Sequence, residues 1–116
     1  MVLDLVHRAR EEYGIPEGST GEQASQAIGL RLSYRPLPDS IDGLLSNNNE
    51  VVINSAQQNL PRPQFTIFHE IMHYLLERDG ELYEYLTDVL SNDQDAFDAA
   101  IERFCQVGAA EFLLPR

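Results

Sequence analysis

A chain of 116 residues is long enough for one hydrophobic core and too short for a second, so we predict a single domain over residues 1–116. Nineteen acidic against eight basic residues give a formal net charge of −11, which argues against direct binding to nucleic acid. Cys105 is the only cysteine, which excludes an internal disulfide. With no signal-peptide pattern and no apolar stretch of membrane-spanning length, we expect a cytoplasmic protein that does not enter the membrane.

Two helices are predicted at the start of the chain. Apolar residues at helical spacing indicate a first helix over residues 3–13. Ser19 or Thr20 can cap a second, short helix over residues 24–28, which Gly29 ends.

Three strands are predicted next. Residues 30–34 alternate between apolar and polar side chains, residues 41–46 form a second candidate, and residues 51–53 are a β-branched run typical of a buried strand. The three asparagines at 47–49 tolerate positive φ and predict the turn of a hairpin. Together with the helices, these strands predict an α+β domain with a small, mostly antiparallel sheet.

The central segment carries the pattern HExxH at residues 69–73. Residues 59–63 lead into it, and the apolar stripe around it has helical spacing. On a helix, His69 and His73 project from one face, where two imidazole nitrogens can converge on a metal ion. Glu70 lies beside that face and is placed to act as a general base on a water molecule.

Two more helices are predicted after the motif. Gly80 is expected to end the motif helix, and residues 81–90 form the next one. One of the polar residues 91–93 can cap a last helix, whose apolar positions keep a helical period as far as Pro115.

A catalytic zinc site normally uses three protein ligands, so the two histidines need a partner. Asp79 lies where the extended pattern HExxHxxGxxH places a ligand, but Leu76 occupies the position of the required glycine. Glu102 lies on the last helix next to a small, apolar face, where a charge is costly unless it is paired or metal-bound. His7 on the first helix is a less favoured candidate. By pattern alone Glu102 could also be a solvent-exposed residue on the surface of the helix, so the sequence pattern does not decide which residue is the third ligand.

Three blocks of the sequence resemble one known family. The resemblance spans about residues 41–115, and the matching blocks are VVIN at 51–54, FTIFHEIMHYLL at 65–76, and IERFC with AAEFLLP at 101–105 and 109–115. Together they resemble the ImmA/IrrE family of zinc metallopeptidases. The resemblance implies one zinc ion per chain, held by His69, His73 and Glu102, with Glu70 as the base.

Two residues depart from the pattern of that family. Phe68 and Met72 replace small residues that usually precede the two histidines. We expect each of them either to narrow the site or to change what packs behind it. The chain also ends just after the last shared block, whereas many relatives continue, so we expect either a truncated chain or a minimal member of the family.

These observations predict a zinc-dependent endopeptidase in which Glu70 moves the proton and a sheet edge holds the substrate. Tyr74, Tyr83 and Tyr85 are candidate donors to the oxyanion, but a packing role is the favoured interpretation of each. The resemblance implies a regulatory role, the cleavage of a helix-turn-helix transcriptional repressor. A charge of −11 suits such a basic partner, and a narrow site predicts little activity on unfolded proteins.

Two other functions fit the same sequence. One is a non-catalytic module that keeps zinc as a structural element and binds a repressor or a similar partner. A structural site is normally closed by four protein ligands, so an open coordination position would argue against this function. The other is a hydrolase that uses the same site on a substrate other than a peptide.

Overall fold

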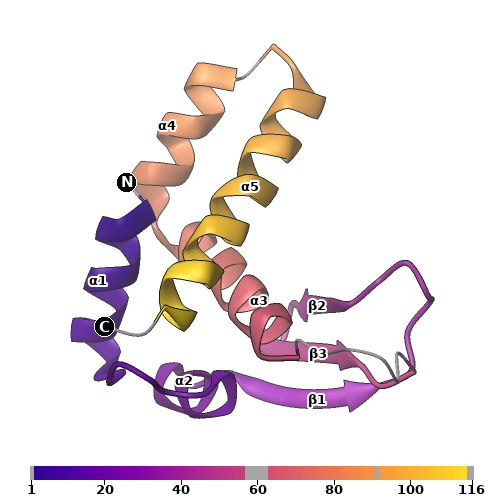
Figure 1. Ribbon diagram of the computed structural model, residues 1–116. Coiled ribbons are helices and arrows are strands. Elements are labelled where there is room, and N and C mark those ends of the chain that lie inside the picture. Colours follow the sequence, from indigo (N-terminus) through magenta and orange to yellow (C-terminus); the bar gives the residue numbers. More distant parts are fainter. Residues whose placement is uncertain (1, 57–62, 91, 115–116) are drawn as a thin grey trace.

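The computed structural model describes residues 2–56, 63–90 and 92–114, and within them the chain forms an α+β domain. Figure 1 shows five helices and three strands in these residues, in agreement with the predicted fold class. In chain order they are α1 (Val2–Tyr13), α2 (Gly21–Ile28), β1 (Arg31–Arg35), β2 (Gly43–Ser46), β3 (Glu50–Asn54), α3 (Pro63–Arg78), α4 (Gly80–Leu90) and α5 (Gln94–Leu113). None of the described helices is both long and apolar enough to cross a membrane.

The three strands form one sheet in the order β1-β3-β2. The predicted hairpin is present, because β2 pairs antiparallel with β3. On its other side β3 pairs parallel with β1, so the sheet is mixed. After β1 the chain passes over to form β2 at the opposite edge of the sheet, and it then turns back to form β3 between the two. Strand β3 therefore runs in the same direction as β1. Alternating side chains predict a strand but not its direction, so the sequence did not indicate this pairing.

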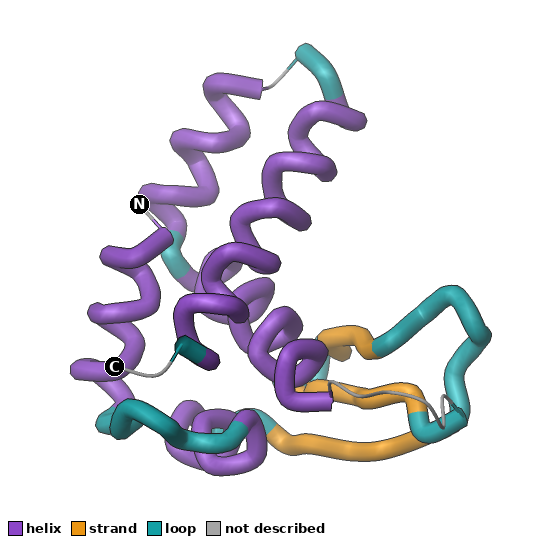
Figure 2. Tube along the Cα trace, viewed as in Figure 1, coloured by secondary structure: helices purple, strands orange, loops and turns teal. Residues whose placement is uncertain are grey.

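Helix α3 is the centre of the fold. It packs against the sheet on one side and against α5 on the other, and Figure 2 shows the strands gathered on one side of this helix. Its fully buried side chains recur at helical spacing: Ile67, Phe68, Ile71, Met72 and Leu76. Burying each such side chain contributes roughly 1.5–3 kcal/mol to folding, so α3 is held in place over most of its length.

Local capping decides where several helices begin and end. The Thr20 hydroxyl accepts a hydrogen bond from the backbone N–H of Gln23, and the Gln23 side chain accepts one from the backbone N–H of Thr20. At the other end, Gly29 terminates α2 with a φ of 93°. Asp93 caps α5, as predicted for residues 91–93. Residues 59–62, part of the predicted lead-in to α3, and Pro115, the predicted end of α5, lie outside the described residues.

The prediction that Gly80 ends the motif helix is wrong. Helix α3 ends at Arg78, and Gly80 is the first residue of α4. The Asp79 carboxylate accepts a hydrogen bond from the backbone N–H of Leu82 at 3.0 Å and so caps the new helix. An acidic cap followed by glycine therefore starts a helix here rather than ending one.

Of the two effects expected of Phe68 and Met72, the structure shows the second: they do not narrow the site, but they change what packs behind it. Both side chains are buried in the core between α3 and α5. Phe68 stacks on Phe112 of α5 with 5.0 Å between ring centroids. Met72 lies against Gly108, where a Cβ would come within 2.9 Å of the Met72 Cγ and closer still to its Sδ and Cε. The larger side chain on α3 is thus accommodated by a glycine on α5.

This close approach predicts that Gly108→Ala destabilises the protein. Overpacking costs about 1–3 kcal/mol, which outweighs the gain of about 0.5–1 kcal/mol that alanine brings to a helix. Gly80→Ala is the matched control, because a Cβ there meets nothing within 4 Å. Urea unfolding should show a lower midpoint for Gly108→Ala alone. Equal midpoints for the two variants would mean that Met72 moves aside without cost.

Candidate active site

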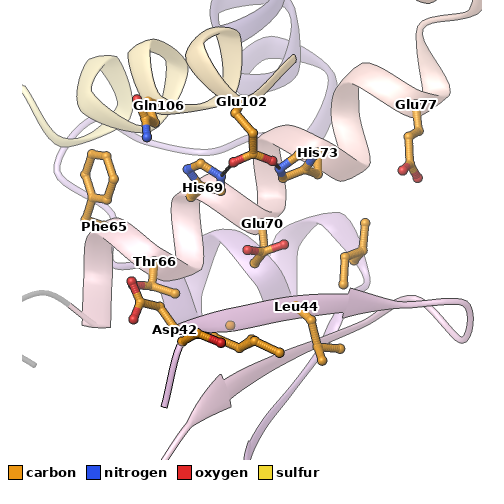
Figure 3. Close-up of a pocket in the computed structure, with 14 residues that line it drawn as sticks. Asp42, Leu44, Phe65, Thr66, His69, Glu70, His73, Glu77, Glu102 and Gln106 are labelled. Atoms are coloured by element: carbon orange, nitrogen blue, oxygen red, sulfur yellow. Dashed lines mark hydrogen bonds and ion pairs between the residues drawn. The ribbon is translucent and has the colours of Figure 1, made fainter. Parts of the chain in front are cut away.

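A cleft of about 540 Å³ opens between α3, α5 and the sheet. Helix α3 forms its floor, and β2 with the residues just before it forms one wall. Figure 3 shows His69, Glu70 and His73 on α3, with Glu102 and Gln106 of α5 on one side and Asp42 and Leu44 on the other.

The two motif histidines and Glu102 lie together in this cleft. One Glu102 oxygen is 3.0 Å from His69 Nε2 and the other is 2.9 Å from His73 Nε2. One potential ligand atom from each residue can be chosen such that all three atoms lie within 4.8 Å of one another. The structure therefore brings together the three residues proposed as ligands.

Packing between α3 and α5 places Glu102. Cys105 and Ala109, one and two turns further along α5, are fully buried, and Gly108 contacts Met72. Glu102 lies at the border of this interface, with about half of its side chain exposed, at 54%. The Glu102 carboxylate is directed at the two histidines (Figure 3), as its proposed role as the third ligand requires.

The other two candidates for the third ligand lie elsewhere. Asp79 pairs with Arg8 at 2.8 Å and caps α4. The pKa of its carboxyl is held below its ordinary value, chiefly by the hydrogen bond from the Leu82 backbone. His7 is an exposed residue of α1. Neither side chain lines the cleft.

Glu70 is a buried carboxylic acid in the floor of the cleft, with 9% of its surface exposed. Burial, together with the smaller effects of the nearby charges of Glu102 and Glu77, raises its pKa from 4.5 to about 7. A group with this pKa exchanges protons readily near neutral pH, as a general base must. Burial also lowers the pKa of His73, which favours the neutral imidazole that can bind a metal.

In the metal-free protein, the raised pKa of Glu70 makes the free energy of unfolding depend on pH. Between about pH 4.5 and pH 7 the folded chain holds the Glu70 proton more tightly than the unfolded chain, so the free energy of unfolding falls as pH rises through this window. The loss is at most about 3 kcal/mol. With a chelator present, we expect Glu70→Gln to be more stable than wild type at about pH 8 and similar to it at about pH 4. Urea unfolding measures both, and a pH-independent difference would contradict the shift.

None of the three tyrosines proposed as oxyanion donors lines the cleft. Tyr74 lies under the guanidinium of Arg78, and Tyr85 is exposed on α4. Tyr83 packs edge-on against Phe97, beside a smaller hollow that His73 and Glu102 also line. Tyr74 and Tyr83 thus have the favoured packing role, and neither Tyr74 nor Tyr85 is placed to donate to an oxyanion in the cleft.

Sequence reasoning overlooked Gln106. It lies one helical turn after Glu102 on α5, and its side chain lines the cleft (Figure 3). An amide N–H₂ group there can donate hydrogen bonds to a substrate. The spacing of four residues from Glu102 was the available signal, because residues four apart share a helix face.

The site thus combines an HExxH helix with a carboxylate from a second helix. A family model described as the IrrE N-terminal-like domain, of the peptidase family M78, matches residues 25–116. The chain belongs to this family.

Two curated relatives are similar to most of the chain. The radiation response metalloprotease IrrE of Deinococcus deserti is 32% identical over 102 residues, which cover 88% of this chain and 35% of the relative. The protein of the same name from Deinococcus radiodurans is 30% identical over 101 residues, which cover 87% of this chain and 30% of the relative. The chain thus spans about a third of the length of these relatives.

Proposed function

We propose that this chain is a zinc-dependent endopeptidase. The observation that carries the proposal is the meeting of His69, His73 and Glu102 in a cleft that also holds the buried carboxyl group of Glu70. Two imidazoles and one carboxylate are a donor set typical of catalytic zinc. Membership of a peptidase family supports the same activity.

Glu70 performs the proton transfers of the reaction. A zinc ion, when bound by the three ligands, supplies Lewis acidity that polarises the scissile carbonyl and acidifies water. Glu70 accepts the proton of the attacking water and delivers it to the nitrogen of the leaving amine, so the carboxylate is regenerated at the end of the cycle.

The wall opposite the metal ligands is suited to hold an extended peptide. Strand β2 lies at the edge of the described sheet, and Gly43, Leu44 and Leu45 line the cleft. Backbone groups on the outer edge of such a strand can pair with a substrate that adds as a further strand. A peptide held in this way runs past His69 and Glu70 with its backbone extended.

A closed structural zinc site is the main alternative. In the part of the chain that the structure describes, the group of possible ligands contains His69, His73 and Glu102 and no fourth residue. Structural sites are usually closed by four protein ligands, whereas catalytic sites leave a position for water or substrate. The donor set therefore favours catalysis over a purely structural ion.

The proposed substrate is a helix-turn-helix repressor, a basic protein. Among the described residues that line the cleft, four are acidic and none is lysine or arginine: Asp42, Glu70, Glu77 and Glu102 are the acidic ones. Their charge, within a chain of net charge −11, favours the approach of a cationic segment. Since Phe68 and Met72 do not narrow the cleft, selectivity for the repressor comes from charge and from the docking of the partner.

The test is to incubate the zinc-loaded chain with the repressor encoded beside it. We expect a single cut, which the Glu70→Gln variant does not make. Unfolded casein is the comparison substrate, and its efficient digestion would contradict a regulatory role. Tight binding of the repressor without any cut would favour the non-catalytic binding module.

A further inference from the structure

The side chain of Asn54, at the end of β3, is buried and makes hydrogen bonds with both ends of its amide. It is 1% exposed. Its Oδ1 accepts from the backbone N–H of Leu37 at 3.0 Å and of Ala56 at 2.9 Å. Its Nδ2 donates to the carbonyl oxygens of Leu37 and Pro38 at 3.1 Å each, and to that of Ile41 at 2.7 Å. Five backbone groups thus converge on one amide.

Four of those five groups belong to the crossover between β1 and β2. This segment, residues 36–42, connects the two outer strands of the sheet and leads directly into the edge strand. The backbone of Asn54 holds it as well, because its N–H donates to the Asp42 carbonyl at 2.8 Å. Within the segment, the N–H of Ile41 donates to the Pro38 carbonyl at 2.9 Å. Asn54 therefore holds this segment through both its side chain and its backbone.

The same segment forms part of the cleft. Ser40, Ile41 and Asp42 line it together with the first residues of β2, opposite His69 and Glu70. Figure 3 shows Asp42 and Leu44 on this side, facing the floor formed by α3. Gly43 lies so close to α3 that a Cβ there would be 2.9 Å from the Thr66 Cγ2. A small displacement of the crossover therefore changes the gap between the edge strand and the metal ligands.

We propose that Asn54 is a positioning residue for the substrate: by fixing residues 37–42 it sets the distance between the peptide-binding edge of β2 and the metal ligands on α3. The inference rests on the proposed function, because it is a peptide substrate that this edge would hold. Asn54 touches neither the substrate nor the ion, and it acts through the segment that it holds.

The proposed metal ligands are positioned mainly by other contacts. His69 and His73 are held by the packing of α3, and Glu102 by the packing of α5. Among the described residues, the side-chain hydrogen bonds of Asn54 lead to Leu37, Pro38, Ile41 and Ala56, and none leads to α3 or α5. A change at Asn54 is therefore expected to move the wall of the cleft and leave the metal ligands in place.

Asn54→Asp is the sharpest change, because it keeps the size of the side chain. The two contacts to backbone N–H groups can persist, but a carboxylate replaces the N–H₂ group and faces the three carbonyl oxygens of Leu37, Pro38 and Ile41. Hydrogen bonds become repulsions at those three positions. Asn47→Asp is the matched control, since it makes the same chemical change on an exposed residue of the β2–β3 turn.

Two zinc-binding probes distinguish a change in the cleft wall formed by β2 from a change in the metal site. Acetohydroxamate is small and contacts the ion and its immediate surroundings, whereas a blocked leucyl-alanyl hydroxamate also presents a peptide backbone to β2. On the zinc-loaded protein, we expect Asn54→Asp to weaken the peptidyl probe by about tenfold or more and to leave acetohydroxamate within about twofold. Amide hydrogen exchange should become faster across residues 36–46, and zinc affinity should be unchanged. Asn47→Asp should behave as wild type.

Other outcomes would overturn the inference. Equal weakening of both probes would show that Asn54 supports the whole site, and no weakening of the peptidyl probe would show that the wall does not depend on it. If Asn54→Asp does not fold, the uncharged Asn54→Ser is used and the same ratio is expected. Failure of both variants to fold would also count against a positioning role. The proposed function is judged separately, because wild-type protein that binds the peptidyl probe but cleaves no peptide would contradict catalysis alone.

Discussion

Replacing Glu70 by Gln is expected to lower the rate of peptide hydrolysis by about 10²–10⁴-fold and to leave zinc binding unchanged. Glutamine has nearly the same size and still lines the cleft, but it cannot accept a proton from water. Glu70 is not one of the three residues whose ligand atoms converge. Turnover of a peptide substrate and the metal content of the purified protein measure the two effects.

The variant also distinguishes catalysis from structure. Loss of zinc together with loss of helical signal would mean that Glu70 is structural, and an unchanged rate would exclude it as the base. Because the neutral amide removes the cost of a buried charge near neutral pH, the metal-free variant should also be no less stable than wild type. A less active and more stable protein is the combined result expected of a buried catalytic acid.

Replacing Glu102 by Ala is expected to weaken zinc binding by at least about 100-fold and to abolish peptide hydrolysis with it. The change removes one of three donors and leaves two imidazoles, which hold the ion poorly. Helix α5 should stay folded, since Glu102 lies at the border of its packed face, with about half of its side chain exposed at 54%. Competition with a chromophoric chelator measures the affinity.

Asp79→Ala and His7→Ala are the controls for this assignment. Both should keep the zinc affinity of wild type, because neither side chain lines the cleft. Asp79→Ala should nevertheless lower stability by about 1 kcal/mol, since it removes a helix cap and the partner of Arg8. If either control lost zinc while Glu102→Ala kept it, the ligand set would be wrong.

Features that depend on neighbours in the chain could be predicted from the sequence alone. The HExxH spacing placed His69 and His73 on one helix face, because helical geometry is a local property. The capping box at Thr20 and the cap at Asp93 were predictable for the same reason, since each involves residues three positions apart. The hairpin of β2 and β3 followed from a turn signal between two strand patterns.

Features that depend on contacts between distant residues were decided by the tertiary structure. Glu102 is 33 residues from His69, and the carboxylate reaches the histidines only because Met72 packs on Gly108 and brings α5 against α3. The same packing buries Phe68 and Met72 behind the site rather than in it. The parallel pairing of β1 with β3 and the hold of Asn54 on residues 37–42 likewise join segments that no local pattern connects. Side-chain patterns specify which faces are buried, but the partner that each face meets depends on how the whole core packs.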